Sequence, residues 1–348
     1  MTIEKILSEW SGRLSCSRYD ERTGAFFTVA VHSLDRGSAA GGTRAMQYAG
    51  YDAAVEDATR LAGAMTLKMA IAGLPMGGGK SVIALPAPRH EIPDDHWRRI
   101  LEIHSENLAT LGGNYWTGPD VGTTSTDMDV LHTASGFAFG RSELSGGPGS
   151  SAPETAHGVH VAIHAASREA GIDDLAGTRV LVQGLGAVGY AVAELVAEEG
   201  ARVVATDVDP ERCERARTEL DAEIIGVDEV LTTASDVFVP CATGGIIDAA
   251  SAAIIPTRVI AGAANNLLVH ESAADVLAER GIVLAPDFVA NGGGAIHLVG
   301  REVLGWDADE VSAHVEGIGD TLQQIFDLAR AENLSAERAA RQLAMTRL

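Results

Sequence analysis

Lysine is scarce in this sequence, and two of the lysines stand close together. Of the 26 basic residues, 23 are arginine and three are lysine, namely Lys5, Lys68 and Lys80. Arginine keeps its proton, whereas a lysine buried beside another cation can lose its proton near neutral pH. A neutral lysine is a base and a charged lysine binds a carboxylate. The pair is consistent with chemistry on a carboxylate-bearing substrate, and equally with the simpler interpretation that arginine-rich coding left the two lysines by chance.

Glycine-containing segments and one aspartate accompany the lysines. Lys80 follows three consecutive glycines, and Asp120 follows Gly118-Pro119. The glycine run is similar to a nucleoside-triphosphate loop, but that motif requires glycine at position 74, where Leu74 stands. We therefore reject a triphosphatase and expect the lysines to supply a carboxylate anchor and a base, with Asp120 relaying protons. Two surface lysines beside an ordinary turn remain the alternative from spacing alone.

A dinucleotide fingerprint occupies the second half of the chain. An apolar stretch, 180–183, runs into Gly184-Leu185-Gly186-Ala187-Val188-Gly189, and Asp207 ends the next apolar stretch. Glycines let the backbone approach a pyrophosphate at a helix N-terminus, and the later carboxylate accepts hydrogen bonds from a ribose. The pattern favours NAD over NADP, although Arg212 lies nearby.

Two further turns follow apolar stretches and are expected at the same sheet edge. They contain the residues Cys241, Ala242, Ala264, Asn265 and Asn266. We expect these turns to line the ribose and the nicotinamide, with one of the two asparagines donating side-chain hydrogen bonds. Asn-Asn is also ordinary turn chemistry.

Three histidines share one face of an expected helix. His157, His160 and His164 stand at i, i+3 and i+7, a spacing that can bind zinc. Only Glu154 lies nearby to complete a ligand set, and the proposed chemistry requires no metal. We therefore expect no metal site.

The elements that must position these residues form an α/β pattern. The chain has 348 residues, enough for two domains, and the Gly/Ser/Pro-rich segment 142–151 is its clearest linker. Strand-like and helix-like stretches alternate after residue 179, which predicts a mainly parallel, doubly wound sheet. The expected elements are a strand at 25–31, a glycine turn followed by a strand at 81–85, helices at 51–64, 94–111 and 155–170, and a helical tail at 309–348.

Composition excludes several classes of function. A formal net charge of −22 argues against nucleic-acid binding, which requires a basic surface. The longest stretch without a charged residue has 14 residues, too short for the roughly 20 of a membrane span. Three unpaired cysteines and no apolar leader favour a soluble cytoplasmic protein.

Together these segments resemble the glutamate/leucine/phenylalanine/valine dehydrogenase family, and phenylalanine dehydrogenases of actinobacteria in particular. The matching segments, in order, are GGTR (41–44), LKMAIAGLPMGGGKSVI (67–83), NYWTGPDVGTTSTDMD (114–129), VLVQGLGAVG (180–189), GAANN (262–266) and PDFVANGGGAI (286–296). The resemblance implies an N-terminal α/β substrate and oligomerisation domain, a Rossmann-type NAD domain and a cleft between them. The domains are expected at 1–145 and 146–324, with a C-terminal helix at about 325–348 packing back on the first.

The resemblance also assigns roles to residues. It implies that Lys68 binds the substrate carboxylate, that Lys80 is the base that activates water, and that Asp120 exchanges protons with the amine and also reaches the cofactor. Arg44, Ser151 and Thr155 would meet NAD from across the cleft. Substrate contacts are implied for Gly41, Gly42, Met65, Gly118, Pro119, Asn265, Ala295 and Leu304.

The implied reaction is the reversible oxidation of an apolar L-amino acid by NAD to a 2-oxo acid, ammonia and NADH in a homo-oligomer. The segment Ala39–Gly42 is apolar, which disfavours glutamate, and Ala40 stands where leucine enzymes carry leucine, which favours phenylalanine. Leucine or valine specificity is the alternative, because such pockets separate apolar homologues by only about 1–3 kcal/mol per methylene. A hydroxy-acid dehydrogenase and a non-catalytic NAD-binding regulator are further alternatives, disfavoured by the lysine pair and by its intact partner Asp120.

Overall fold

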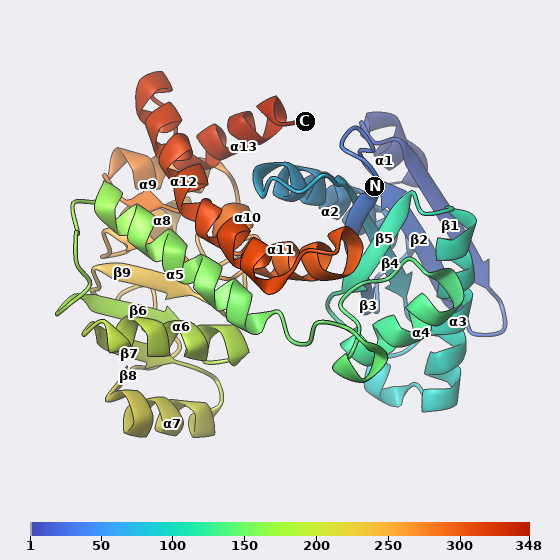
Figure 1. Cartoon of the computed structure of the whole chain (residues 1–348), viewed down its shortest axis with the longest axis horizontal. Helices are drawn as coiled ribbons and strands as arrows, with labels where there is room; N and C mark the ends of the chain where they lie inside the picture. The colour runs from blue at the N-terminus through green and yellow to red at the C-terminus, as the bar shows by residue number, and fades with distance from the viewer. Residues whose placement is uncertain (1) are drawn as a thin grey trace. The chain divides into compact units, whose positions relative to one another are not determined.

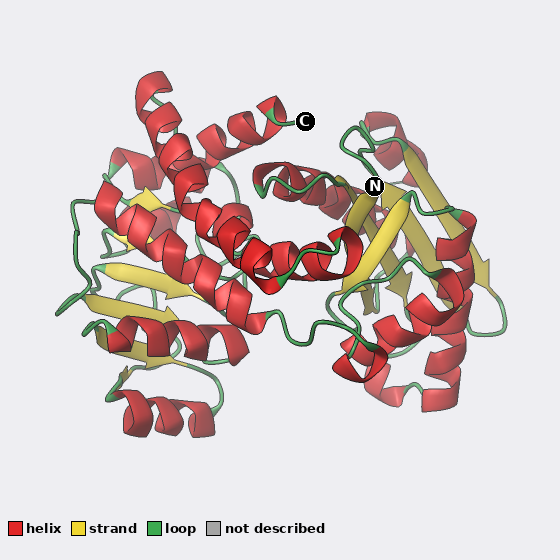
Figure 2. Cartoon of the chain, viewed as in Figure 1, coloured by secondary structure: helices red, strands yellow, loops and turns green. Residues whose placement is uncertain are grey.

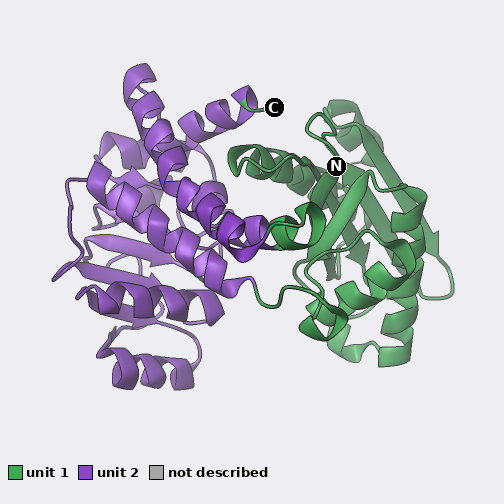
Figure 3. Cartoon of the chain, in the orientation of Figure 1, with its two compact units in different colours: residues 1–150, 298–306, 347–348 green, residues 151–297, 307–346 purple. Residues whose placement is uncertain are grey.

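Two β-sheets, each with its own helices, make up the chain in a computed structural model that describes residues 2–348. The first unit contains the chain through residue 150 together with 298–306 and 347–348, and the second contains 151–297 and 307–346 (Figure 3). We call them unit 1 and unit 2. Both are α/β, as expected. The observed division differs from the expected boundaries, because two short segments near the end of the chain, 298–306 and 347–348, belong to unit 1.

Unit 1 contains a mixed five-stranded sheet (Figure 1). Its strands, in the spatial order β1-β2-β4-β3-β5, are β1 Leu14–Asp20, β2 Ala25–Val31, β4 Gly77–Ala84, β3 Ala39–Met46 and β5 Tyr115–Pro119. β1, β2 and β4 pair antiparallel, whereas β3 pairs parallel with both β4 and β5. Parallel β4, β3 and β5 thus bring their carboxyl ends to one edge of the sheet.

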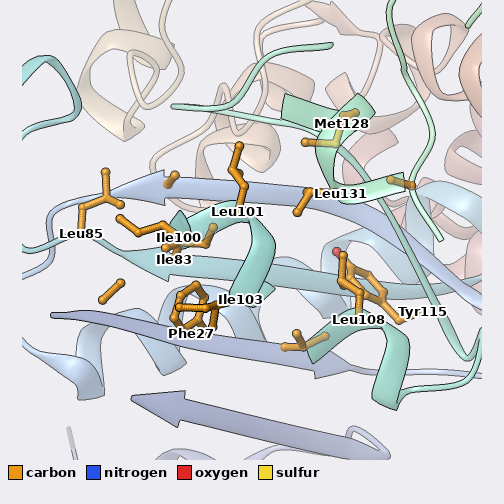
Figure 4. Packing of buried hydrophobic residues seen from close by; sticks show 14 of the residues in the cluster. Phe27, Ile83, Leu85, Ile100, Leu101, Ile103, Leu108, Tyr115, Met128 and Leu131 are labelled. Atoms are coloured by element: carbon orange, nitrogen blue, oxygen red, sulfur yellow. The ribbon is translucent and has the colours of Figure 1, made fainter. Parts of the chain in front are cut away.

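Helices cover both faces of this sheet. Alternate residues of β2 and β4 point to opposite sides, as the pleat of a strand requires. Phe27 and Ile83 join a core with α3 (Asp94–Thr110) and α4 (Ser125–Ser135), shown in Figure 4. Phe26 and Val82 pack instead against α2 (Tyr51–Ile71), and α1 (Ile3–Glu9) adds Ile6 to that second core.

The glycine run before Lys80 lies inside a strand, which corrects the expected turn. β4 begins at Gly77 and is buried along its whole length. A Cβ atom at Gly78 would lie 2.1 Å from the backbone nitrogen of Thr66 on α2, and one at Gly77 would lie 1.9 Å from the Ser33 carbonyl oxygen. Glycine is disfavoured in strands. Here it lets α2 lie directly on the strand, and α2 extends beyond the predicted helix at 51–64 to include Lys68.

Unit 2 has the parallel, doubly wound sheet that the sequence predicts. All six strands pair parallel, in the order β11-β10-β9-β6-β7-β8, with helices around them (Figure 2). The strands are β6 Arg179–Gln183, β7 Arg202–Thr206, β8 Glu223–Ile224, β9 Val237–Pro240, β10 Val259–Ile260 and β11 Val283–Leu284. The helices are α5 Ala152–Glu169, α6 Ala187–Glu198, α7 Pro210–Leu220, α8 Ala249–Ile254, α9 Ser272–Glu279, α10 Asp287–Ala290, α11 Gly293–Val299, α12 Ala308–Glu332 and α13 Ala336–Thr346. The chain reverses its winding between β6 and β9, where such sheets bind ligands.

The C-terminal helices differ from the expectation. The predicted continuous tail is two helices, separated where Asn333 adopts a left-handed conformation (φ 55°). α12 packs on α5, and α13 packs on α9 and β11, all within unit 2. Ala339, Ala340 and Ala344 of α13 are buried. The expected packing of this helix on the first domain stays a prediction. Only residues 347–348 belong to unit 1, where Arg347 Nη1 donates to the Ile71 carbonyl at 2.7 Å.

Within residues 2–348, no helix combines the length and the apolar character that crossing a membrane requires.

Candidate active site

A buried lysine–aspartate ion pair lies at the strand edge of unit 1. The Lys80 side chain is 5% exposed, and its Nζ contacts Oδ2 of Asp120, which directly follows β5. Lys80 belongs to β4, and β3 separates β4 from β5 in the sheet. The two predicted catalytic residues are thus brought together across an intervening strand.

Gly42 makes this crossing possible. The pairing register of β3 and β4 places Gly42 beside Lys80, and Gly42 also pairs with Gly118 on β5. A Cβ at Gly42 would lie 2.9 Å from the Cβ of Asp120 and 3.2 Å from its Oδ2. Any side chain there would occupy the path between the lysine and the aspartate. Gly42 therefore has a steric role in this site, in addition to the predicted contact with substrate.

Further charges surround the pair. Arg44 Nε lies 3.2 Å from Oδ1 of Asp120, and its Nη1 lies 3.1 Å from Oδ2 of Asp57 on α2. Asp57 also accepts from the Tyr48 hydroxyl at 2.8 Å and from Arg60 Nη2 at 2.6 Å. Arg44, predicted to meet the cofactor, is here the second cation on Asp120. The sequence interpretation missed Asp57, because nothing in its own segment marks it.

Burial and these charges set the protonation of the pair. Burial lowers the pKa of Lys80, and the charge of Arg44 lowers it further, while Asp120 opposes both. Burial alone would raise the pKa of Asp120, but Lys80 first and then Arg44 hold it below its usual value. Lys80 therefore loses its proton more easily than an exposed lysine, and Asp120 stays charged. This arrangement fits a base and a proton-exchanging carboxylate.

A cluster of hydroxyl groups lies on the other face of the same three strands. Thr43 Oγ1 of β3 lies 2.7 Å from Ser81 Oγ of β4 and 2.6 Å from Thr117 Oγ1 of β5. His104 of α3 approaches Ser81 and Thr43 through Nε2, at 3.2 and 3.3 Å. Burial lowers the pKa of His104 to about 3, so this imidazole is neutral. The cluster joins the strands that carry Arg44, Lys80 and Asp120, and sequence patterns gave no sign of it.

Lys68 lies near the end of α2 and is half-buried. One turn earlier, Met65 faces β3, with its Cγ 3.5 Å from a Cβ placed at Gly41. Gly118 packs against the Phe139 ring, where a Cβ would come within 2.3 Å. Their predicted contacts with substrate, and that of Pro119, stay predictions.

The glycine fingerprint in unit 2 has the geometry expected for a pyrophosphate. Gly184 has φ 90°, a conformation that favours glycine, and Gly186 is the N-cap of α6. A Cβ at Gly189 would lie 1.9 Å from the Gly184 carbonyl oxygen, so this residue must be glycine for the helix to start here. The turn also contains Leu185, Ala187 and Val188, and its backbone N–H groups lie at the N-terminus of α6. These residues fit a dinucleotide.

The predicted ribose-binding carboxylate is held in place by backbone groups. Asp207 follows β7; its Oδ2 accepts from Leu185 N at 2.6 Å and its Oδ1 from Asp209 N at 2.9 Å. A carboxylate has about four acceptor positions, so capacity for a ribose hydroxyl is left. Arg212 lies 3.6 Å from Asp207 and 3.3 Å from Asp209. The carboxylates of Asp207 and Asp209 thus neutralise Arg212, the residue whose charge could otherwise favour NADP over NAD.

The turns after β9 and β10 meet the fingerprint as expected. Ala242 Cβ lies 2.8 Å from a Cβ placed at Gly184, and burial raises the pKa of the neighbouring Cys241 thiol to about 12. Ala264 N donates to the Pro240 carbonyl at 2.9 Å. Two adjacent strand ends and their turns therefore line one region of unit 2.

The two candidate asparagines differ in their surroundings. Asn265 Oδ1 accepts from Asn291 Nδ2 at 2.9 Å, which fixes the orientation of its amide. Asn266 has φ 52° and so serves the turn. Asn265 is the better candidate for a side-chain contact with ligand. Asn291, which the sequence interpretation did not assign, lies in the quoted segment 286–296 and is 5% exposed.

Ser151 and Thr155 belong to unit 2, within the expected cofactor domain, and their contact with the cofactor stays a prediction. Ser151 is the N-cap of α5, and the Thr155 hydroxyl donates to its carbonyl at 2.7 Å. Of that predicted trio, only Arg44 lies in the other unit. The predicted pocket residues Ala295 and Leu304 fall in units 2 and 1 respectively, and their shared role stays a prediction.

Comparison with known proteins agrees with these features. Residues 21–135 match the family described as Glu/Leu/Phe/Val dehydrogenase, dimerisation domain, and residues 146–210 and 211–348 match Glutamate/Leucine/Phenylalanine/Valine dehydrogenase. Together the matches extend over most of the chain and include both sites described above.

Individual relatives are similar over nearly their whole length. Leucine dehydrogenase of Thermoactinomyces intermedius is 38% identical over 94% of this chain and 88% of its own. Valine dehydrogenase of Streptomyces virginiae is 37% identical, over 94% and 91%. The crystal structure of L-tryptophan dehydrogenase from Nostoc punctiforme has a TM-score of 0.84 at 31% identity, covering 99% of this chain and 98% of that one.

Proposed function

Because the chain belongs to the Glu/Leu/Phe/Val dehydrogenase family, whose members are NAD(H)-dependent amino-acid dehydrogenases, we propose that it oxidatively deaminates an apolar L-amino acid, preferentially L-phenylalanine. The family and the cofactor, NAD, agree with the sequence prediction. The preference for phenylalanine is the finer step that we propose here, together with the roles of individual residues.

The observation that carries the proposal is the buried contact between Lys80 and Asp120. Deamination of an imine requires a base for the attacking water and a group that exchanges protons with nitrogen. Lys80 meets the first requirement because burial lowers its pKa. Asp120 meets the second, since it remains ionised beside two cations. A hydroxy-acid dehydrogenase acts on an alcohol, so its reaction requires neither a base for water attacking an imine nor a group that exchanges protons with nitrogen.

Each residue then has a separate role. Lys68 holds the substrate carboxylate, which orients the Cα and the amine. NAD, held by the turn 184–189 and Asp207, supplies the acceptor for the hydride that leaves Cα. Asp120 takes a proton from the ammonium group of the substrate before the hydride leaves. Lys80 takes a proton from water as the water adds to the imine carbon, and Asp120 then returns its proton to the departing amine. Asn265, oriented by Asn291, positions the bound groups through its amide.

Small residues on β3 support an apolar substrate. Ala39 and Ala40 are fully buried, and Ala40 pairs with Gly78. The family resemblance implies that Ala40 stands where leucine enzymes carry leucine, and the shorter side chain of alanine favours a larger substrate. The names of the relatives, which specify leucine, valine and tryptophan, support both branched-chain and aromatic alternatives.

The test is a set of 2-oxo acids assayed for ammonia-dependent oxidation of NADH. Phenylpyruvate should give the highest kcat/KM, with lower values for the oxo acids of leucine, valine and tryptophan, and little rate with 2-oxoglutarate. A branched-chain oxo acid ahead of phenylpyruvate would overturn the substrate preference. Oxidation that proceeds equally without ammonia would overturn the reaction itself.

We also propose a cytoplasmic homo-oligomer formed through unit 1. The family description of residues 21–135 as a dimerisation domain supports the assembly. β1 is an edge strand of its sheet, and Leu14 and Tyr19 on it are 44% and 52% exposed. An exposed edge with apolar side chains is suited to pairing with another copy. Three free cysteines support the location.

A further inference from the structure

Two histidines and one glutamate converge between α5 and the C-terminal end of α6 in unit 2, and none of the three has a role above. His160 and His164 are one turn apart on α5, and Glu199 is the C-cap of α6. Glu199 Oε1 lies 2.6 Å from His160 Nε2 and 3.0 Å from His164 Nε2. The two Nε2 atoms lie 3.3 Å from each other. Three potential metal ligands therefore form a triangle with one atom from each side chain.

We propose that His160, His164 and Glu199 bind a divalent transition-metal ion, of which zinc is the best match. A tetrahedral zinc site has bonds of roughly 2.0–2.2 Å, so its ligand atoms stand about 3.3–3.5 Å apart. The separation of the two histidine nitrogens already matches this spacing. The His164–Glu199 contact needs to widen by a few tenths of an ångström and the His160–Glu199 contact by about 0.7 Å or more, which side-chain torsions supply. Two imidazoles and one carboxylate suit zinc, and leave one coordination position for water.

The surroundings favour a cation at this place. The three side chains are 20%, 28% and 33% exposed, so an ion can enter but is partly shielded from solvent. Packing of α5 on α6 holds the ligands on two rigid helices, which lowers the entropy lost on binding. The chain has a formal charge of −22, which also attracts cations.

This ligand set differs from the one that the sequence pattern suggested. His157 shares the helix face, but its Nε2 lies 2.5 Å from Glu316 of α12 and not with the other two histidines. Glu154, the nearby acid considered from sequence, lies 3.2 Å from His297. The expectation of no metal site rests on the lack of a nearby residue other than Glu154 to complete the ligand set, and on a reaction that requires no metal. Glu199 supplies it from 35 positions beyond His164, which helical spacing could not reveal.

The experiment is zinc titration of the full-length chain without an affinity tag, since a histidine tag would itself bind zinc. Calorimetry should give one Zn²⁺ per chain at this site, and bound Co²⁺ should show the intense visible absorption of tetrahedral coordination. His164→Gln and Glu199→Gln should each weaken zinc binding at least about 100-fold, more than the roughly 10–100-fold typical of outer partners. Circular dichroism with and without zinc verifies that each variant is folded.

His157→Gln is the matched control, because it removes a histidine from the same face of the same helix. It should bind zinc as the unaltered chain does. Weakening by His157→Gln and His164→Gln with no effect of Glu199→Gln would overturn the ligand set in favour of a site along α5. Unaltered zinc affinity in Glu199→Gln and His164→Gln, or no Co²⁺ absorption, would show that the three side chains form only a hydrogen-bonded cluster and would overturn the proposal.

Discussion

The proposed role of Lys80 as a base depends on surroundings that disfavour its charge. An exposed lysine has a pKa of about 10.4 and is almost fully protonated at neutral pH. Burial lowers the pKa of Lys80, and Arg44 adds to the effect. The rate of deamination should therefore rise with pH through a pKa below that of an ordinary lysine, as Lys80 loses its proton.

Arg44→Gln should move this rise to higher pH. Removal of the neighbouring positive charge stabilises the protonated form of Lys80. The pKa of Lys80 in the pH profile of kcat/KM should therefore increase by roughly one unit. Arg60→Gln is the control, because it removes a cation that contacts Asp57 and not Asp120. If the two variants have the same profile as the unaltered enzyme, Arg44 does not set the protonation of Lys80.

Asp207 should determine the choice between NAD and NADP. Its carboxylate holds the Leu185 N–H of the glycine turn and helps to neutralise Arg212. Asp207→Ala should raise the KM for NAD about 10-fold or more, the value of a charged hydrogen bond. It should also raise activity with NADP, because Arg212 becomes available to a 2′-phosphate. Steady-state kinetics with both cofactors measures this; a variant as selective for NAD as the parent would contradict it.

Residues that carry chemistry through their own type could be predicted from the sequence. Lys68 and Lys80 are marked by rarity, and the fingerprint at 184–189 is marked by spacing. Asp57 and His104 could not be predicted, because each gains its role from partners on other elements. The same holds for Asn291, whose role is its hydrogen bond to the amide of Asn265. A periodic pattern contains no information about such contacts.

At the scale of elements, close packing of α2 on β4 brings the lysine-bearing helix and strand together. Gly78→Ala should disturb it, because the new Cβ would lie 2.1 Å from the Thr66 backbone nitrogen, which cannot swing away. Overpacking costs about 1–3 kcal/mol, and 1 kcal/mol corresponds to roughly 2–4 °C in a chain of this class. We expect a melting temperature several degrees lower and a higher KM for the amino acid.

Gly317→Ala supplies the matched control for that loss. Gly317 lies in α12, and a Cβ there would have nothing within 4 Å. Because alanine is better than glycine inside a helix, the melting temperature should stay the same or rise slightly. Equal losses in the two variants would mean that removal of any glycine is harmful and that the packing of α2 is not the cause.

The elements of unit 2 were predictable, and those of unit 1 were less so. Parallel strands buried on both sides form continuous apolar runs between helices, so the alternation after residue 179 was evident. The local pattern predicts a turn at GGGK in β4 and predicts no strand at GGT in β3 or at TGP in β5. These segments are strands because neighbouring helices and strands approach them at distances that only glycine permits. The information lies in the tertiary packing, which a local pattern does not contain.

At the scale of the whole molecule, the proposed assembly through unit 1 should be measurable as a molecular mass larger than that of one chain. Light scattering should give a multiple of the 36.2 kDa chain. Leu14→Asp with Tyr19→Asp should reduce it, because charges on an edge strand oppose pairing. Val227→Asp, an exposed position in unit 2, should leave the mass unchanged. A monomeric parent, or an edge variant with the parent's mass, would contradict assembly through β1.

The most direct test of Lys80 as the base is the turnover of three lysine-to-alanine variants with L-phenylalanine and NAD. Lys80→Ala should lower kcat about 10³-fold or more, near the upper range for loss of general base catalysis. Lys68→Ala should chiefly raise KM, by roughly 10–100-fold, because it loses a charged contact with the carboxylate. Lys5→Ala, which removes an exposed lysine, should retain full activity. A Lys80→Ala variant that retains the kcat of the parent would contradict the assignment of the base.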